Sequence, residues 1–291
     1  MNTYTVDLDF DRDFVGMLTE ELREHGYPLT GTEDPRDLKI QYFNFKKRLV
    51  PAVMRRVQKA AGFTCPAGLE PGLNAVVEKI KQGDDLKPYL STKLKDLDYP
   101  DAMLNDWGIY HLHLGTTLES NGFMSRTGPV LYVRFDMTDA YLINVIDHGA
   151  WTDQELVRTL WRSWPASLEG FRMKGIVGMD FIPTDADVKK LRKAQTNTFV
   201  EVEKGVFLAP IGGGHTMSSR GVGIDVVRAM MSYDDLVRGF EKAVRGNKDP
   251  LGALLKEKYG LAGEHMVFSL CMINGEYLAV EQQTRVGFPL D

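Results

Sequence analysis

The chain has 291 residues, 43% of them hydrophobic and 26% charged, and its formal net charge at pH 7 is -5. This length and apolar content suit one large or two modest globular domains and argue against extended disorder. No run approaches the roughly 18 apolar residues of a membrane helix, and residues 1–7 lack the basic and apolar regions of a secretory signal. We therefore expect a cytoplasmic protein with no membrane partner.

The first region, residues 1–104, is expected to be mainly helical. Apolar spacing predicts one helix from Asp11 to His25, before Gly26, and another from Leu73 to Lys81, before Gly83. Alternating apolar and polar residues predict a strand from Leu38 to Phe45.

Two further segments complete the first region. Pro51 can open a short helix from Ala52 to Ala61, because proline is well tolerated in a first helical turn. Residues 84–100 carry seven charges and two prolines and should form a surface connection.

A basic segment covers residues 36–59, which contain eight cationic residues and one acidic residue, Asp37. The rest of the chain therefore has a net charge near -12. Aromatic residues lie among the cations, a mixture typical of proteins that bind single-stranded nucleic acid. The candidate binding residues are Lys46, Lys47, Arg48, Arg55, Arg56, Tyr42 and Phe45. The alternative is an amphipathic segment with a solvated basic edge and aromatics that belong to the core.

The middle region, residues 105–165, has the pattern of three strands and a helix. Trp107 to Gly115 should be the first strand, and residues 130–136 and 140–148 should form a tight hairpin. Thr152 with Glu155 has the spacing of a capping box for a helix that ends at Trp164.

Two histidines lie on the first of these strands. His111 and His113 are two residues apart, so their side chains should share one face of the sheet. His148 follows the hairpin. Such imidazoles can bind a metal, transfer protons or take part in a hydrogen-bonded core, and the sequence leaves all three readings open.

The metal reading uses His111, His113, His148 and Glu119. A histidine pair on one strand with a later carboxylate and histidine resembles the cupin pattern, whose ligands hold iron or zinc. The match is incomplete, because five residues separate His113 from Glu119 where cupins have three or four. The proline and glycine of the second cupin motif are also missing.

The proton-transfer reading follows from the order of strand, loop with Arg126, hairpin and Asp147-His148. Over residues 107–149 this layout resembles RelE/ParE-like toxins, whose ribonuclease members cleave messenger RNA without metal on a small antiparallel sheet. The resemblance implies that His111 or His113 withdraws a proton from a ribose 2′-hydroxyl and His148 protonates the leaving 5′-oxygen. Arg126 or Arg134 would stabilise the phosphate charge.

The third region, residues 166–291, mixes helices and strands. Strands are expected at Thr198 to Val202 and Val206 to Leu208, and helices at Asp225 to Val244 and Pro250 to Tyr259. A closing hairpin should turn at Asn274-Gly275, the strongest turn signal in the chain. The glycine-rich loop at 211–221 fits no phosphate-binding motif and is expected to be a flexible connection.

These patterns predict an α+β protein with a central antiparallel sheet and three regions, residues 1–104, 105–165 and 166–291. The leading functional hypothesis is a metal-independent ribonuclease that uses His111, His113, Arg126 and His148 and needs no cofactor. Its partners would be RNA or another single-stranded nucleic acid and, secondly, a protein inhibitor. The alternatives are a nucleic-acid-binding or interaction protein with structural histidines, and a cupin-like metal enzyme.

Overall fold

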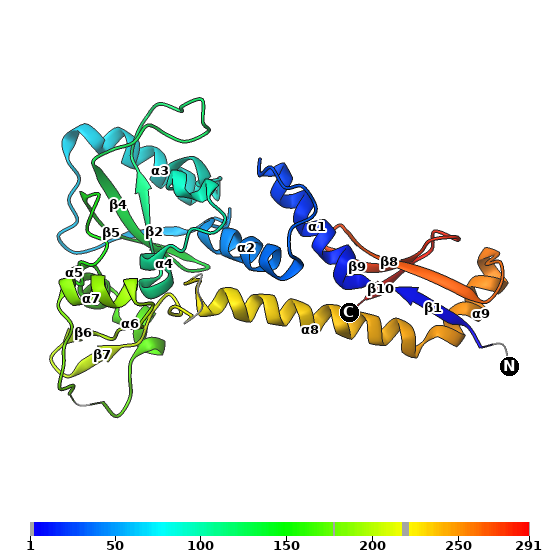
Figure 1. Cartoon of the computed structure of the whole chain (residues 1–291). Helices are drawn as coiled ribbons and strands as arrows, with labels where there is room; N and C mark the ends of the chain where they lie inside the picture. The colour runs from blue at the N-terminus through cyan, green and yellow to red at the C-terminus, as the bar shows by residue number, and fades with distance from the viewer. Residues whose placement is uncertain (1–2, 177, 217–220, 291) are drawn as a thin grey trace. The chain divides into compact units, whose positions relative to one another are not determined.

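The computed structural model describes residues 3–176, 178–216 and 221–290 and shows helices with mixed sheets, which confirms the α+β class (Figure 1). The chain divides into two compact units. Unit 1 combines Met1–Phe43 with Arg228–Asp291, and unit 2 is the continuous stretch Asn44–Val227. Both ends of the chain therefore belong to one unit, a division that differs from the three consecutive regions expected from the sequence.

Unit 1 is built on a four-stranded sheet in the order β1-β8-β9-β10, with β1 parallel to β8 and the other pairs antiparallel. The predicted turn at Asn274-Gly275 joins β8 to β9, and both residues have the positive φ that such a turn needs. Its elements are β1 (Thr5–Leu8), α1 (Phe10–Glu24), α9 (Lys248–Tyr259), β8 (His265–Ile273), β9 (Glu276–Glu281) and β10 (Gly287–Leu290). The helices α2 (Pro35–Arg48) and α8 (Ile224–Gly246) each continue from one unit into the other.

Unit 2 contains a second four-stranded sheet in the order β2-β5-β4-β3. Its β3, β4 and β5 form the predicted antiparallel meander, and β2 adds to β5 in parallel. The elements are β2 (Arg56–Lys59), α3 (Glu70–Gln82), α4 (Ala102–Trp107), β3 (Ile109–His113), β4 (Pro129–Phe135), β5 (Asp139–Asp147), α5 (Glu155–Ser163), α6 (Pro165–Leu168), α7 (Asp185–Lys193), β6 (Val200–Glu203) and β7 (Val206–Leu208).

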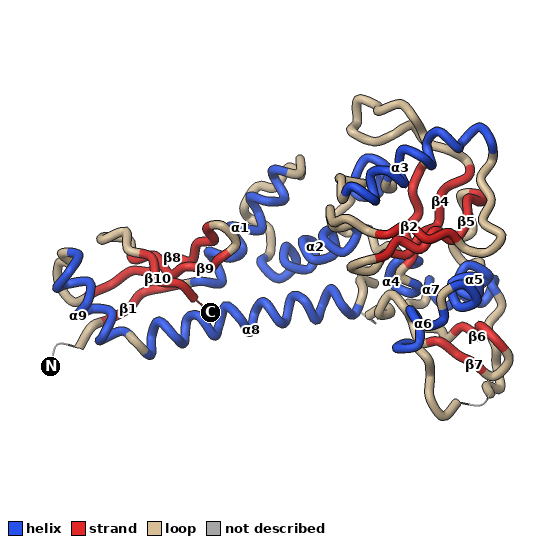
Figure 2. Tube along the Cα trace, turned by 180° about the vertical axis from the view of Figure 1, so that it is seen from behind, coloured by secondary structure: helices blue, strands red, loops and turns tan. Residues whose placement is uncertain are grey.

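The main core of unit 2 lies between one face of this sheet and the segment that follows it. Ile109 of β3 and Tyr132 of β4 pack in one cluster with residues of α5, α6, α7 and the β6–β7 hairpin. Figure 2 shows these helices and the hairpin beside the sheet of unit 2. Each fully buried side chain of this kind contributes about 1.5–3 kcal/mol through removal of apolar surface from water. The same face carries His111 and His113, so the candidate residues lie beside a well-packed core.

Two predictions for the N-terminal part are wrong. Residues 38–45 belong to helix α2 rather than to a strand, and residues 56–59 form strand β2 within the stretch predicted as the helix from 52 to 61. The helix buries Leu38 and Phe45 together with the charged Lys39 and Arg48. Because two of its buried residues are charged, the apolar residues alone do not show the helical spacing in the sequence. Strand β2 exists because it pairs with β5, about 80 residues later in the chain.

Other expectations change in detail. Helix α5 begins after Gln154 and not at Thr152. The N–H of Glu155, the first residue of the helix, donates to the carboxylate of Asp153 at 2.9 Å. The connection at residues 84–100 contains two short 3-10 helices and buries Tyr89 and Leu94.

The glycine-rich loop is packed in its described part. The N–H of Gly212 donates to the Asp106 carbonyl and that of Gly214 to the Asn105 carbonyl. A Cβ on Gly212 would lie 2.0 Å from the Leu104 carbonyl oxygen, so the loop rests directly on α4. Residues 217–220 lie outside the described residues. Among the described helices, none combines the length and the apolar character needed to cross a bilayer.

Candidate functional site

Strand β3 places His111 and His113 on the same face, as the alternation of side chains requires. In the antiparallel register His111 lies opposite Tyr132 of β4, and His113 lies opposite Val130. Both histidines are buried, with 7% and 2% of their surface exposed. The pairing with β4 therefore fixes both rings against the core of unit 2.

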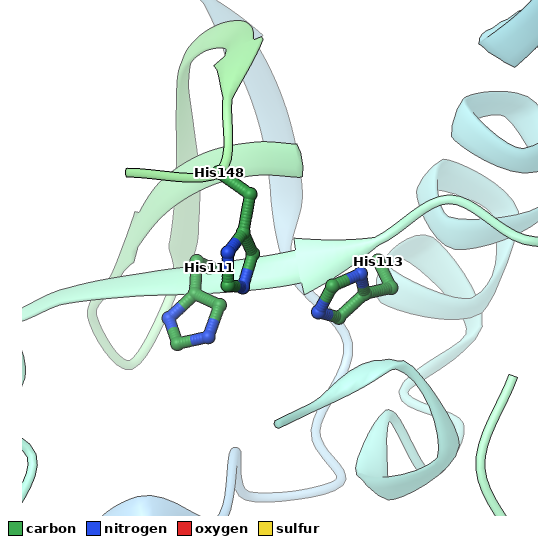
Figure 3. Close-up of side chains that lie close together, drawn as sticks. All are labelled: His111, His113 and His148. Carbon is green, nitrogen blue, oxygen red and sulfur yellow. The ribbon is translucent and has the colours of Figure 1, made fainter. Parts of the chain in front are cut away.

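His148 joins this pair from the end of β5. Its backbone N–H donates to the Gly128 carbonyl at 2.9 Å, which ties the residue to the segment that leads into β4. One ring nitrogen from each of the three histidines lies within 4.8 Å of the others, and the rings turn toward one another (Figure 3). His148 is exposed, so the cluster can be reached from solvent.

Trp151 forms one wall of the histidine cluster. Its ring centroid is 4.6 Å from that of His111 and 4.6 Å from that of His148, with both contacts edge to face. The indole therefore fixes the orientation of both imidazoles. Sequence reasoning missed this residue, although its position three residues after His148 on a turn was a usable signal.

A backbone hydrogen bond determines the tautomer of His113. The N–H of Thr127 donates to its Nδ1 at 3.1 Å. A nitrogen that accepts a hydrogen bond carries no proton, so the neutral ring must carry its proton on Nε2. This Nε2 is buried and has no hydrogen-bond partner among the described residues. His113 thus presents an unused N–H donor to whatever enters the cluster.

Arg126 supplies a positive charge to the three histidines. The residue is exposed as a whole, and its guanidinium donates to the Leu90 carbonyl at 3.2 Å in a partly buried environment. Burial lowers the pKa values of His111 and His113 to about 3, and the positive charge of Arg126 contributes to both shifts. Burial and Arg126 also lower the pKa of His148. All three imidazoles are therefore neutral at pH 7.

Three of the four residues expected to form the site, the histidines, thus come together in space, and the charge of Arg126 acts on all three. Neutral imidazoles can bind a metal or accept a proton, whereas an imidazolium that could donate one is disfavoured. Glu119, the carboxylate of the cupin-like reading, is not in the cluster and accepts the side-chain N–H of Asn121 at 3.0 Å. No carboxylate accompanies the three histidines within the described parts of the chain.

The basic segment has a largely structural role. Phe45, Arg48 and Arg55 are buried, and both arginines donate to main-chain carbonyls of unit 2. Such burial removes these three residues from any surface that could contact RNA.

The other four candidate binding residues are more accessible. Lys47 pairs with Asp225 at 2.6 Å, and Tyr42, in unit 1, donates its hydroxyl to Glu21. Lys46 and Arg56 are the exposed cations among these four, although Arg56 pairs with Asp139. Arg36 and Lys59 are also exposed, so half of the eight cations in residues 36–59 remain accessible to solvent.

In comparisons with known proteins, no protein-family model, no curated protein and no solved structure matches the chain. The function must therefore be argued from the site itself.

Proposed function

We propose that the chain is a metal-independent ribonuclease whose active site is the cluster of His111, His113, His148 and Arg126. The observation that carries the proposal is the convergence of three imidazoles, with no carboxylate among them, within reach of the positive charge of Arg126. The Nε2–H of His113 and the positive charge of Arg126 favour an anion such as a phosphodiester in this site. The layout of residues 107–149, similar to RelE/ParE-like ribonucleases, supports the same reading.

The pKa directions change the roles that the sequence had implied. His148 is neutral and exposed, so it acts as the base that takes the proton of the ribose 2′-hydroxyl. The 2′-oxygen forms a bond to phosphorus, the bond from phosphorus to the 5′-oxygen breaks, and that oxygen takes a proton from water. Arg126 and the Nε2–H of His113 stabilise the charge on the phosphate oxygens.

The test is cleavage of a fluorescent single-stranded RNA in excess EDTA. We expect products with a 2′,3′-cyclic phosphate, and no cleavage of the same sequence as DNA, which lacks the attacking hydroxyl. Replacement of the base, His148→Gln, should reduce the rate by about a hundredfold or more. His265→Gln, at an exposed histidine of unit 1, is the matched control and should leave the rate unchanged. Cleavage of DNA, or an intact rate in His148→Gln, would contradict the proposal.

A second candidate is a metal-dependent enzyme, favoured by the 4.8 Å clustering of three histidine nitrogens. Three histidines with one open position are a ligand set of catalytic zinc. Tetrahedral bonds of about 2.1 Å would require the nitrogens to approach to roughly 3.4 Å. His113 would also have to lose the Thr127 hydrogen bond, because a metal on Nδ1 takes the accepting lone pair and a metal on Nε2 moves the ring proton to Nδ1. One equivalent of zinc in the purified protein, with activity lost in EDTA, would favour this candidate.

A protein inhibitor of the ribonuclease, expected from the sequence, stays a prediction.

A further inference from the structure

A cavity of about 340 Å³ lies in unit 2 where β3 begins and β4 ends. Aromatic side chains of Tyr110, Phe135 and Phe171 contribute to its walls, and residues 211–213 of the glycine-rich loop line one side. Arg134 and Lys47 also line it. The volume falls within the usual range of small-molecule sites, about 300–1,000 Å³.

Arg134 is the unusual residue of this cavity. It lies on β4 opposite Ile109, and its guanidinium carbon is 5.6 Å from the ring centroid of Tyr141 and 6.0 Å from that of Phe171. Its Nη1 is buried without a hydrogen-bond partner, and none of the residues that the structure describes forms an ion pair with the guanidinium. A buried charged donor left without a partner is strongly unfavourable.

Asp136 lies two residues after Arg134, and its negative charge acts on the guanidinium without forming an ion pair. Its carboxylate accepts the N–H groups of Thr138 and Asp139 and the hydroxyl of Tyr141. The guanidinium has five N–H donors, so an anion in the cavity would supply acceptors that these residues do not.

The other charges of the cavity balance one another. Lys47 donates to Asp225 at 2.6 Å and to the Gly212 carbonyl at 2.9 Å. The Tyr110 hydroxyl donates to the Lys47 carbonyl at 2.8 Å, so neither residue needs a ligand. Arg134 therefore gives the cavity a net positive charge.

We propose that this cavity binds a mononucleotide, with the phosphate on Arg134 and the base against the aromatic wall. The planar guanidinium matches two phosphate oxygens, and aromatic rings stack on bases of any identity. The cavity has room for one such unit. This site is separate from the histidine cluster and does not depend on the ribonuclease proposal.

Calorimetric titration of the full chain tests the assignment with three probes, namely adenosine monophosphate, adenosine and inorganic phosphate. Adenosine monophosphate should bind most tightly, because it alone uses both halves of the cavity. Arg134→Gln should weaken its binding by about tenfold or more, and Arg134→Lys by less, because the charge remains while the paired geometry is lost. Arg162→Gln, at an exposed arginine of α5, should leave binding unchanged.

A second variant distinguishes a loss of binding from a folding defect in Arg134→Gln. Phe135→Leu removes a ring of the cavity wall that is not stacked on Arg134, so it should weaken nucleotide binding and leave phosphate binding unchanged. Adenosine that binds as tightly as its monophosphate would overturn the proposal. Nucleotide binding that is lost in Arg126→Gln but kept in Arg134→Gln would also overturn it, because the ligand would then lie at the histidine cluster.

Discussion

The backbone N–H of Thr127 donates to Nδ1 of His113, and this contact fixes which nitrogen of a buried catalytic candidate carries the proton. Thr127 itself is held in place, because its hydroxyl donates to the Pro129 carbonyl at 2.6 Å and accepts the N–H of Leu114 at 3.2 Å. The contacts of Thr127 at the end of β3 and the start of β4 therefore determine that His113 presents its Nε2–H to the cluster.

The first prediction concerns this tautomer. Nitrogen-15 NMR of the imidazoles should show His113 with a protonated Nε2 and an unprotonated Nδ1 from neutral pH down to below pH 5, because its pKa is lowered to about 3. The exposed His265 serves as an internal reference in the same spectrum. A proton found on Nδ1 would remove the donor role of His113 and restore it as a metal ligand.

The second prediction is a pH profile of RNA cleavage. Burial and the charge of Arg126 lower the pKa of His148, so kcat/KM should rise with pH through an inflection below 6.5 and then stay level. Arg126→Gln removes the positive charge and should move this inflection upward, whereas Arg162→Gln should not. A falling limb near neutral pH would instead indicate an imidazolium acid, as the sequence had implied.

The third prediction concerns stability. An unfolded chain binds protons at histidine near pH 6.5, but the folded chain keeps His111 and His113 neutral down to about pH 3. The free energy of unfolding should therefore be level above pH 6.5 and fall between pH 6.5 and 3, by up to about 1.4 kcal/mol per pH unit for each histidine. Urea denaturation across this range measures the slope. His111→Asn should make it shallower, and an unchanged slope in this variant would contradict the burial argument.

The fourth prediction concerns a buried ion pair in unit 2. Arg192 donates to Asp106 at 2.9 Å, and their side chains are only 5% and 1% exposed. Arg192→Met leaves the carboxylate uncompensated and should lower the free energy of unfolding by about 3–5 kcal/mol. Arg162→Met breaks a half-exposed pair with Glu155 and should cost about 1 kcal/mol or less. Equal losses in the two variants would contradict the role of burial.

The fifth prediction concerns the contact between α3 and the chain just after β3. A Cβ on Gly72 would lie 1.9 Å from the Leu114 carbonyl oxygen, so Gly72→Ala should lower stability by about 1–3 kcal/mol. Gly16→Ala, in α1, meets no atom within 4 Å and should instead stabilise its helix by up to about 1 kcal/mol. Thermal unfolding compares the two, and a neutral Gly72→Ala would show that the helix can shift.

The candidate site could be predicted because its residues are close in sequence. The shared face of His111 and His113 follows from strand alternation, and the hairpin that brings His148 back is local. The basic segment could not be predicted in the same way. Lys39 is buried because Asp11 and Asp234 bind it, and Arg48 because distant carbonyls do. Periodicity rules assign charged residues to the surface and contain no term for such remote partners.

The assembly of unit 1 from both ends of the chain has a consequence for biosynthesis. Thr5–Leu8 pairs with β8, which begins only at His265, whereas the sheet that carries the histidine cluster is complete at Asp147. On a translating ribosome the inner unit can fold while the N-terminal strand still lacks its neighbour. Thr5–Leu8 therefore has no strand to pair with until the residues from His265 onward have been synthesised.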